Sequence, residues 1–464
     1  MGFAELSRSI GARLLSFSAD GGHQDRGFSS VSIDSRNVKE GALFVALTGT
    51  LNDGHSFVHA AFNAGARGAM VESSKLDSFN LAAIAQKTGK ELIAVENTLK
   101  GLQDSARVYL EKFPKLLKIG ITGSSGKTTT KEIAAAIIST EKNTVMNRGN
   151  LNSETGLPLS VFEVRPHHEV GVFELGMNRK GEIAEITAVL KPNIALITNI
   201  GHAHIGNIGS MQAIAEEKKN IFSLLADNDA ALIPNDDEYC DFLADGLGGR
   251  ARFYGAGLFT ELEGVHSLGL EGSEISWAGE NIRFALPGKH SLDDAMAAIA
   301  IAREVPVSSS AIKRGLENVK PLFGRLEILK GRTTVIQDCY NANPESAQKV
   351  LEFCDSLDWN GRKLYVAADM LELGKDSLPA HSHIGSLLAE SKADMIFLFG
   401  EEIRSAAQCL KNKGRPFFHT DNILELSAAL DSYVQTGDLV LLKGSRGCAL
   451  ERLSGMLTEA VNVS

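Results

Sequence analysis

Short apolar runs alternate with helix-length segments of mixed polarity along the whole chain, and this pattern predicts an α/β fold. In the first part, a buried-type strand over 43–47 precedes a Gly/Asn/Asp turn, and a helix over 57–64 precedes a strand over 68–71. The segment 98–113 has helical periodicity. We therefore expect a small N-terminal α/β domain over residues 1–96.

The middle of the chain repeats the alternation with longer apolar runs. A polar, Gly-rich stretch over 245–280 indicates a β-rich insertion, and the Ala-rich run from Lys131 indicates a helix. The other predicted elements are strands over 170–173 and 194–200 and helices over 211–225 and 292–303. Strands separated by crossover helices predict a parallel sheet, so we expect a central domain over 97–324.

After a segment over 320–325 that is typical of a linker, the pattern starts again. Apolar strands, each separated from the next by a helix-length segment, are predicted over 334–337, 363–367, 395–399 and 438–442. This order predicts a second doubly wound, Rossmann-like domain over 325–464.

Composition narrows the class of protein. The 464 residues are 44% hydrophobic and 22% charged, which is typical of a globular domain protein. The 47 basic and 57 acidic residues give a net charge of −10, and without a dense basic block this argues against nucleic acid as a partner. The five cysteines are scattered, which argues against a disulfide framework. We expect a cytoplasmic protein with no signal peptide and no membrane span.

A glycine-rich loop between an apolar strand and a helix, over residues 118–130, carries the clearest chemical signal. Gly123 and Gly126 allow the backbone to turn sharply around an anion. Lys127 can reach terminal phosphates, and the Thr128 hydroxyl is placed to bind Mg²⁺. The spacing is a short G-x-x-G-K-T-T form, and the alternative is an ordinary turn before a helix. We favour nucleotide binding because Lys-Thr-Thr stands at the helix start.

Two further sites lie at strand ends. Glu174 ends an apolar strand, where its carboxylate could hold Mg²⁺, and its apolar neighbours argue against a solvated edge position. His202 and His204 also follow a strand, but they are too close in sequence for a usual paired zinc site. One of them could bind a metal or a phosphate, although each alone is more often structural.

Two more segments are ambiguous. The charged run over 216–220 is typical, by itself, of a solvated helix face. Clustered Tyr and Asn side chains over 338–344 follow a strand of the last domain, where they suit base or ribose recognition. The same residues would also make a good turn.

In their order along the chain, these segments resemble the Mur ligases, the ATP-dependent amide-forming enzymes of peptidoglycan precursor synthesis. The resemblance covers essentially the whole chain. Asp34, Ser35 and Arg36, with the segments 41–47 and 53–55, resemble the family's UDP-sugar-binding N-terminal domain, which implies that Ser35 and Arg36 bind substrate.

The resemblance extends through the central and last domains. Residues 122–131 resemble the family's ATP loop, and 147–158 resemble the following substrate loop, in which Asn150 and Asn152 would bind substrate. Residues 340–344, 369–374 and 443–447 are most like the member that adds D-alanyl-D-alanine to UDP-N-acetylmuramoyl-tripeptide. The Asp-Asn-Pro-Arg motif usual in the diaminopimelate-adding relative is not found. The identity of the tripeptide's third residue, lysine or diaminopimelate, stays open.

Site roles follow from the resemblance residue by residue. It implies two Mg²⁺ ions, an acyl-phosphate intermediate and a monomer. The implied catalytic residues are Lys127, Glu174, His204 and Lys218. Lys218 would be carbamylated, and the implied metal ligands are Thr128, Glu174, His204 and Lys218. The implied ATP contacts are Gly123, Ser124, Ser125, Gly126, Lys127, Thr128, Thr129, Asp294, Arg325, Asp338, Tyr340 and Asn341.

One departure from the family pattern concerns Asp294, which the resemblance places among the ATP contacts and where an asparagine is usual. The nearest alternative function is that of another Mur-type ligase, such as the diaminopimelate- or lysine-adding enzyme, and two rivals lie further away. A folylpolyglutamate synthase type of ligase lacks the N-terminal domain that carries Asp34 to Arg36. A nucleotide-binding switch would hydrolyse ATP slowly and ignore the dipeptide.

Overall fold

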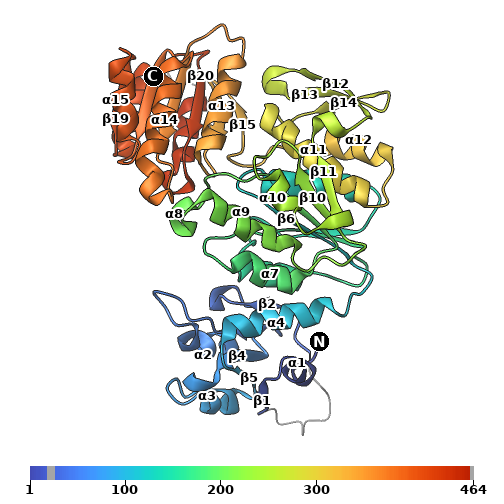
Figure 1. Ribbon diagram of the computed structural model, residues 1–464. Coiled ribbons are helices and arrows are strands. Elements are labelled where there is room, and N and C mark those ends of the chain that lie inside the picture. Colours follow the sequence, from blue (N-terminus) through green and yellow to red (C-terminus); the bar gives the residue numbers. More distant parts are fainter. Residues whose placement is uncertain (18–26, 460–464) are drawn as a thin grey trace.

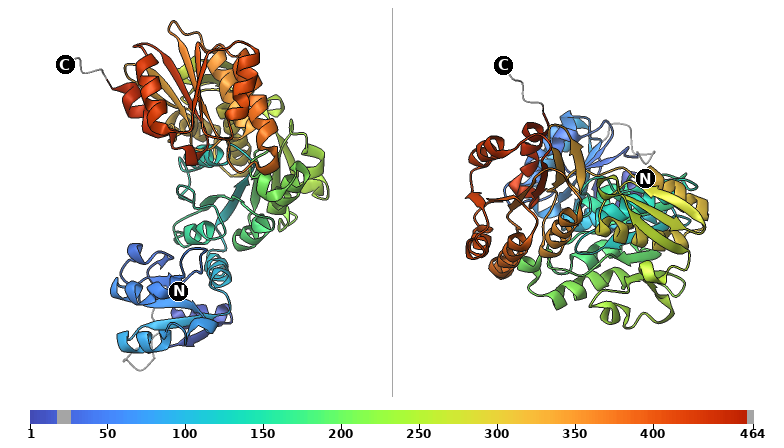
Figure 2. Two further views of the ribbon diagram at one scale, coloured as in Figure 1. Left: turned by 90° about the vertical axis from the view of Figure 1, so that its left-hand side faces the viewer. Right: turned by 90° about the horizontal axis from the view of Figure 1, so that it is seen from above.

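The computed structural model describes residues 1–17 and 27–459. Figure 1 shows three α/β bodies in sequence order, with the N-terminal body (blue) at one end and the C-terminal body (red) at the other. Figure 2 shows the same order from a second side. The prediction of an α/β fold with several parallel sheets is confirmed. The domain boundaries at 96 and 324 stay a prediction.

The N-terminal body is a five-stranded sheet with helices. Its strands, in spatial order, are β1 (Arg13–Leu15), β5 (Glu91–Val95), β4 (Gly68–Glu72), β3 (Leu43–Val45) and β2 (Val31–Ser32). Only β1 is antiparallel to its neighbour. Its helices are α1 (Phe3–Ser9), α2 (Val58–Asn63), α3 (Leu81–Thr88) and α4 (Thr98–Leu110).

The central body is a six-stranded, fully parallel sheet. Its strands, in spatial order, are β11 (Ala251–Tyr254), β10 (Ala230–Pro234), β9 (Ile194–Ile197), β6 (Leu117–Thr122), β8 (Val170–Glu174) and β7 (Thr144–Met146). Its helices are α5 (Lys127–Ile138), α6 (Gly156–Val161), α7 (Glu182–Leu190), α8 (Ile205–Ile208), α9 (Met211–Lys219), α10 (Cys240–Ala244), α11 (Lys289–Glu304) and α12 (Ser309–Asn318).

Alternation along the central strands sorts side chains between two cores. Ile194 and Leu196 of β9 pack in the cluster with α5 and α11, whereas Ala195 and Ile197 pack in the cluster with α7. Successive side chains of a strand point to opposite faces, so a parallel sheet covered on both faces has continuous apolar strands. This layering fixes the carboxyl ends of β6, β8 and β9 at one edge.

Several element boundaries differ from the sequence prediction. Helix α5 begins at Lys127 and not at Lys131, so the loop lysine lies in the first helical turn. Strand β9 ends at Ile197, and α9 ends at Lys219 before the short 3₁₀ turn η4 (Asn220–Phe222). The expected β-rich insertion is divided: β11 joins the central sheet, and a separate antiparallel sheet contains β12 (Leu262–Ser267), β13 (Ser273–Trp277) and β14 (Glu280–Phe284).

The C-terminal body is a second six-stranded sheet, parallel except at the edge strand β15. Its strands, in spatial order, are β15 (Glu327–Lys330), β16 (Thr334–Asp338), β20 (Leu439–Lys443), β17 (Lys363–Ala368), β18 (Met395–Phe399) and β19 (Phe417–Thr420). Its helices are α13 (Pro344–Ser356), α14 (Ser377–Glu390), α15 (Arg404–Asn412), α16 (Ile423–Tyr433) and α17 (Ser454–Thr458). Strands β15 and β19 were not predicted.

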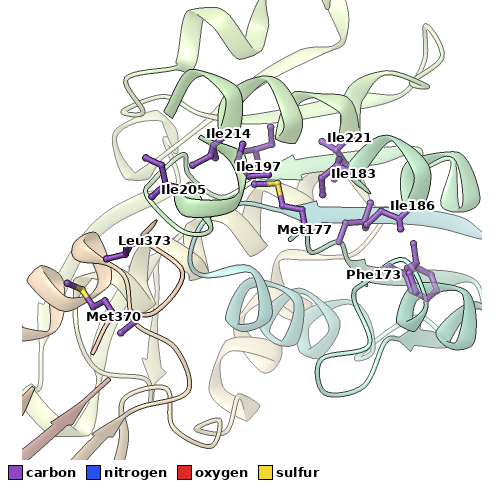
Figure 3. Close-up of a cluster of buried hydrophobic side chains, with 14 of the residues drawn as sticks. Phe173, Met177, Ile183, Ile186, Ile197, Ile205, Ile214, Ile221, Met370 and Leu373 are labelled. Atoms are coloured by element: carbon purple, nitrogen blue, oxygen red, sulfur yellow. The ribbon is translucent and has the colours of Figure 1, made fainter. Parts of the chain in front are cut away.

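The central and C-terminal bodies share packed apolar side chains. Met370 and Leu373, from the loop after β17, belong to the same buried cluster as Ile205 of α8 (Figure 3). The Gly206 amide donates to the Glu372 carbonyl at 3.0 Å. A Cβ at Gly206 would lie 2.7 Å from that carbonyl oxygen, so only glycine permits this approach. No helix of the described residues is long and apolar enough to cross a membrane.

Candidate active site

The phosphate loop joins β6 to α5 and admits only glycine at two positions. At Gly123, with φ +150°, a Cβ would lie 1.8 Å from the Thr198 hydroxyl oxygen. At Gly126, with φ +78°, a Cβ would lie 2.1 Å from Asp294 Oδ1. Residues with a side chain rarely adopt such φ values, and at these two positions a Cβ would also clash with its neighbours. The loop therefore folds tightly against Thr198, which follows β9, and against Asp294 of α11, and its amides lie at the start of α5.

The end of β9 anchors this loop. The Ser125 amide donates to Asn199 Oδ1 at 3.1 Å, and the Thr198 hydroxyl donates to the Ser125 carbonyl at 2.6 Å. The Ser124 hydroxyl donates to the Gly201 carbonyl at 2.9 Å. These bonds explain why β9 stops at Ile197: the following polar residues hold the loop instead of extending the strand. Thr198 and Asn199 were not predicted to have a role from the sequence.

Two lysines converge on one backbone carbonyl. Lys127 Nζ donates to the Gly123 carbonyl at 2.8 Å, and Lys218 Nζ, from α9, donates to the same oxygen at 2.9 Å. Lys218 is 1% exposed. Burial and the neighbouring charge of Lys127 hold the pKa of Lys218 well below its usual range. Burial also lowers the pKa of Lys127, against the attraction of Glu174.

The charged run over 216–220 is not the solvated helix face that its composition predicted. Lys218 is buried, and Glu217 is 6% exposed and accepts from the amides of Gly181 and Ile183 at 2.8 and 2.9 Å. Glu217 thus satisfies free amides at the start of α7. The helix turns these two residues inward, and Glu216 is the exposed residue of the run.

A carboxylate and a hydroxyl meet beside the loop. Glu174, which ends β8, is 2% exposed and accepts from the Thr128 hydroxyl at 2.8 Å and from Asn152 Nδ2 at 2.6 Å. Arg325 Nη2 donates to the same Thr128 oxygen at 2.8 Å. The interpretation of Glu174 as a site carboxylate and not a solvated edge residue agrees with this burial. Oxygen donors of this kind suit a hard cation such as Mg²⁺.

His202 and His204 both reach across to the C-terminal body. His204 Nδ1 lies 2.6 Å from Glu372 Oε2, and the His202 ring pairs with Glu345 at the start of α13. The adjacent His204 ring lowers the pKa of Glu372. Among residues 1–17 and 27–459, no three His, Cys, Asp or Glu side chains form a group that could hold a metal. A cation here would therefore need ligands beyond Glu174 and His204.

Polar residues at and after the end of β16 include side chains that line the site and a residue that caps α13. Asp338 Oδ2 accepts from Lys443 Nζ at 2.7 Å, and the Arg325 guanidinium lies over the Tyr340 ring at 4.3 Å. Asn341 Oδ1 accepts from the next amide at 2.9 Å. Asn343 caps α13, so the turn interpretation holds for this end of the segment.

Asp294 belongs to α11, and its carboxyl lies beside the start of α5. Its Oδ1 is 3.5 Å from the Thr130 hydroxyl, and this is its hydrogen bond among the described residues. Burial, with the nearby charge of Asp293, raises the pKa of Asp294 to about 8. The carboxyl is therefore mostly protonated at neutral pH, when it can both donate and accept.

One cavity of about 740 Å³ brings most of the predicted residues together between the central and C-terminal bodies. The predicted residues that line it are Ser124, Ser125, Gly126, Lys127, Thr128, Thr129, Asn150, Asn152, Glu174, His204, Lys218, Asp294, Arg325, Asp338, Tyr340 and Asn341. Gly123 lies beneath its floor, where its carbonyl holds both lysines.

Ser35 and Arg36 are not brought to this cavity. They form a 3₁₀ turn in the N-terminal body, where the Arg36 guanidinium binds Asp34 with Nη2–Oδ2 at 2.7 Å. Arg36 also lowers the pKa of Asp34 to about 2.

Several other residues that line the cavity were not predicted from the sequence. One is His290, whose pKa burial lowers to about 4, so the ring is neutral at pH 7. Lys349 of α13 and Tyr254 of β11 also line the cavity, and no sequence motif marked them.

Three family models match the chain. They are the Mur ligase middle domain over 121–302, the Mur ligase glutamate ligase domain over 324–446 and the Mur ligase family catalytic domain over 28–109. The chain belongs to the Mur ligase family, and it is an ATP-dependent, amide-forming ligase.

Curated relatives narrow the comparison within the family. The chain is 44% identical to a UDP-N-acetylmuramoyl-tripeptide–D-alanyl-D-alanine ligase of Treponema pallidum over 93% of this chain and 94% of the relative. It is 34% identical to the enzyme of the same name from Bacillus subtilis, over 93% of each chain.

Solved structures agree. MurF from Acinetobacter baumannii matches with a TM-score of 0.85 and 28% identity over 98% of each chain. MurF ligase from Thermotoga maritima in complex with ADP matches with a TM-score of 0.77 and 26% identity, over 92% of this chain and 96% of that one.

Proposed function

We propose that this enzyme joins D-alanyl-D-alanine to UDP-N-acetylmuramoyl-tripeptide in peptidoglycan precursor synthesis. The observation that carries the proposal is the 44% identity to a ligase of that name over nearly the full length of both chains. The cavity between the central and C-terminal bodies supports the proposal, because the phosphate loop of the central body and residues of the C-terminal body line the same space.

The reaction has two bond-forming steps. The terminal carboxylate of the tripeptide attacks the γ-phosphorus of ATP, so that ADP leaves and an acyl phosphate forms. The amine of the dipeptide then attacks the acyl carbon, phosphate leaves, and the amine loses a proton. Lys127 and the amides at the start of α5 stabilise the negative charge where two anions meet. Closure of the cavity protects the acyl phosphate from water.

We infer that Mg²⁺ binds at Thr128 and Glu174, with His204 and a carbamylated Lys218 as further ligands. Bound there, the cation would neutralise phosphate charge. The buried Lys218 amine supports the modification, because a neutral amine can attack CO₂, forming an N–C bond and releasing one proton. The product is an anionic carbamate, so the Lys218 side chain would offer a metal ion a carboxylate-like oxygen ligand.

Other parts of the proposal concern the rest of the chain. Residues 1–96 would form the UDP-sugar-binding domain with Ser35 and Arg36 as contacts, 97–324 the ATP-binding domain and 325–464 the dipeptide-binding domain. Arg325, Tyr340, Asn341 and Asp338 would contact the nucleotide. We expect a monomer that works in the cytoplasm, where ATP is available.

Phosphate release tests the proposal. ATP is supplied with UDP-N-acetylmuramoyl-tripeptides that contain lysine or diaminopimelate, each with and without D-alanyl-D-alanine. We expect phosphate and the joined product to form only when both substrates are present, and the panel also decides the third residue. Slow ATP hydrolysis that ignores the dipeptide would indicate a nucleotide switch instead.

A further inference from the structure

The C-terminal sheet has a crevice at the carboxyl ends of β17 and β20. After β17 the chain continues through α14 to β18, but after β20 it turns back through η10 (Leu450–Leu453) to α17, which packs on β16. Neighbouring loops that leave a parallel sheet in opposite directions open a crevice where ligands bind. The two loops are joined: the Ser445 amide donates to the Asp369 carbonyl at 3.0 Å, and the Leu371 amide donates to Ser445 Oγ at 2.9 Å.

Arg446 extends from this crevice. Its Nη1 donates to Glu451 Oε1 at 2.8 Å, and its guanidinium lies over the Phe323 ring at 5.1 Å. The side chain is still 53% exposed. Its Nε and Nη2 atoms have no hydrogen-bond partner among the described residues. Nε and Nη2 lie on one edge of the guanidinium, and this edge can bind a carboxylate through two parallel hydrogen bonds.

Apolar side chains flank this guanidinium. Phe323 and Leu371 are 48% and 38% exposed, which is high for large hydrophobic residues. Leu371 lies against Gly447, the neighbour of Arg446: a Cβ there would be 2.8 Å from Leu371 Cδ1. The surface thus offers a positively charged guanidinium stacked on one exposed apolar ring, with a second exposed apolar side chain beside the adjacent residue.

The segment that carries Phe323 leads directly to the phosphate loop. Leu322 and Gly324 line the main cavity, and Arg325 donates to Thr128. A ligand whose charged end lies at Arg446 can therefore direct its other end into that cavity.

We infer that this surface binds the carboxyl end of the acceptor dipeptide. Arg446 takes the terminal carboxylate, while Phe323 and Leu371 contact the methyl groups, and the amine points toward the acyl phosphate. D-alanyl-D-alanine has these groups and no other side-chain chemistry. The inference rests on the proposed function and adds to it the residues that select the acceptor.

The test compares two acceptors, D-alanyl-D-alanine and D-alanyl-D-alaninamide, which lacks the carboxylate. We expect the wild-type KM to be roughly ten- to a hundred-fold higher for the amide, because a hydrogen-bonded charge is lost. In Arg446→Gln the KM for the acid should rise by a similar factor, so that the two acceptors become nearly equal. The KM values for ATP and the UDP-tripeptide should not change.

Two matched variants separate recognition from structure. Arg452→Gln makes the same change on a neighbouring exposed arginine and should behave as wild type. Glu451→Gln breaks the ion pair but keeps Arg446, so it should retain the preference for the acid. Leu371→Asn should raise the KM of both acceptors by the same factor, because its contact does not involve the carboxylate.

Three results would overturn the assignment. The first is that Arg446→Gln still prefers the acid to the amide. The second is that Glu451→Gln loses this preference as Arg446→Gln should. The third is that Arg446→Gln raises the KM for ATP and not the KM for the dipeptide. Failure of the wild-type enzyme to use either acceptor, with ATP and UDP-tripeptide present, would instead remove the proposed function and the inference with it. Equal melting temperatures of the variants exclude a folding defect.

Discussion

The central and C-terminal sheets both present the carboxyl ends of their strands to the cavity, but their charges are arranged differently. On the C-terminal side, Lys443 pairs with Asp338 and Arg446 with Glu451. On the central side, Lys127 and Lys218 share one carbonyl, and neither has a carboxylate partner within 4.0 Å among the described residues. The basic side chains at the C-terminal edge are thus already paired with carboxylates, whereas those at the central edge are free to pair with a bound anion.

This difference has an energetic basis. A buried ammonium without a counter-charge is unfavourable, and proteins respond by lowering its pKa. A triphosphate supplies a negative charge for Lys127, so part of the free energy of ATP binding should come from pairing this buried ammonium. Because the C-terminal edge already has its partners, it can serve as a preformed platform for a small acceptor.

The largest effect should follow removal of Lys127, the centre of the unbalanced edge. Lys127→Ala should lower amide formation by at least about a hundred-fold, since a donor aimed at transition-state charge is lost. The fold should persist, because the substitution removes a buried ammonium that binds backbone carbonyls and leaves no carboxylate without its ion-pair partner. Phosphate release and thermal melting measure the two effects.

Lys142→Ala, on the surface beyond the end of α5, is the control and should retain activity. ATP turnover near the wild-type rate in Lys127→Ala would contradict the role of this lysine.

The second effect concerns Lys218, whose lowered pKa favours the neutral amine. Lys218→Ala should lose most activity, and short carboxylates such as acetate should restore part of it by replacing the carbamate. Intact-protein mass should show one added CO₂ in active enzyme. Lys219→Ala is a matched control, because Lys219 points away and donates to the Phe242 carbonyl at 2.6 Å.

An unmodified mass in active enzyme together with no carboxylate rescue would remove the carbamate from the mechanism. If short carboxylates restore activity to Lys218→Ala but not to Lys127→Ala, then Lys218 supplies an anionic ligand and Lys127 supplies a positive charge.

The same contrast explains what could be predicted from sequence. The phosphate loop was found because glycine spacing, Lys127 and Thr128 act locally on one ligand. The charge pattern alone placed Glu217 and Lys218 on a solvated face, because a charged helix run does not show which face is covered, and only the family resemblance singled out Lys218. Their burial depends on contacts with Gly181 and Gly123, far away in sequence.

The fold shows the same division. Strands β6, β8 and β9 of the central sheet and the interior strands of the C-terminal sheet were predicted, since each is an apolar run buried on both faces. The interior strand β10 was not predicted, although it is buried along its whole length. Strand β19 and the edge strand β15 were missed, because short edge strands carry weak alternation. The surface at Arg446 was also missed, since the segment that contains Phe323 was interpreted only as a linker, and its contact with Arg446 spans two distant loops.

The smallest effect concerns Asp294, where charge at the central edge depends on pH. The folded state keeps a proton on this carboxyl up to about pH 8, whereas the unfolded chain loses it near pH 4. The stability contribution of Asp294 therefore falls as pH rises between these values. Asp294→Asn removes the titration, so its melting temperature relative to wild type should rise with pH across this window.

ATP affinity should follow the same titration. Near pH 6.5 the neutral acid can donate and accept as an amide does, so Asp294→Asn and wild type should have similar KM values for ATP. Above pH 8 the wild-type carboxylate can only accept, and it adds negative charge beside the phosphate loop. The variant should then bind ATP several-fold more tightly, about 0.5–1.5 kcal/mol, with kcat little changed. Equal KM values at both pH values would place Asp294 outside the nucleotide site and leave it as a partner of Thr130.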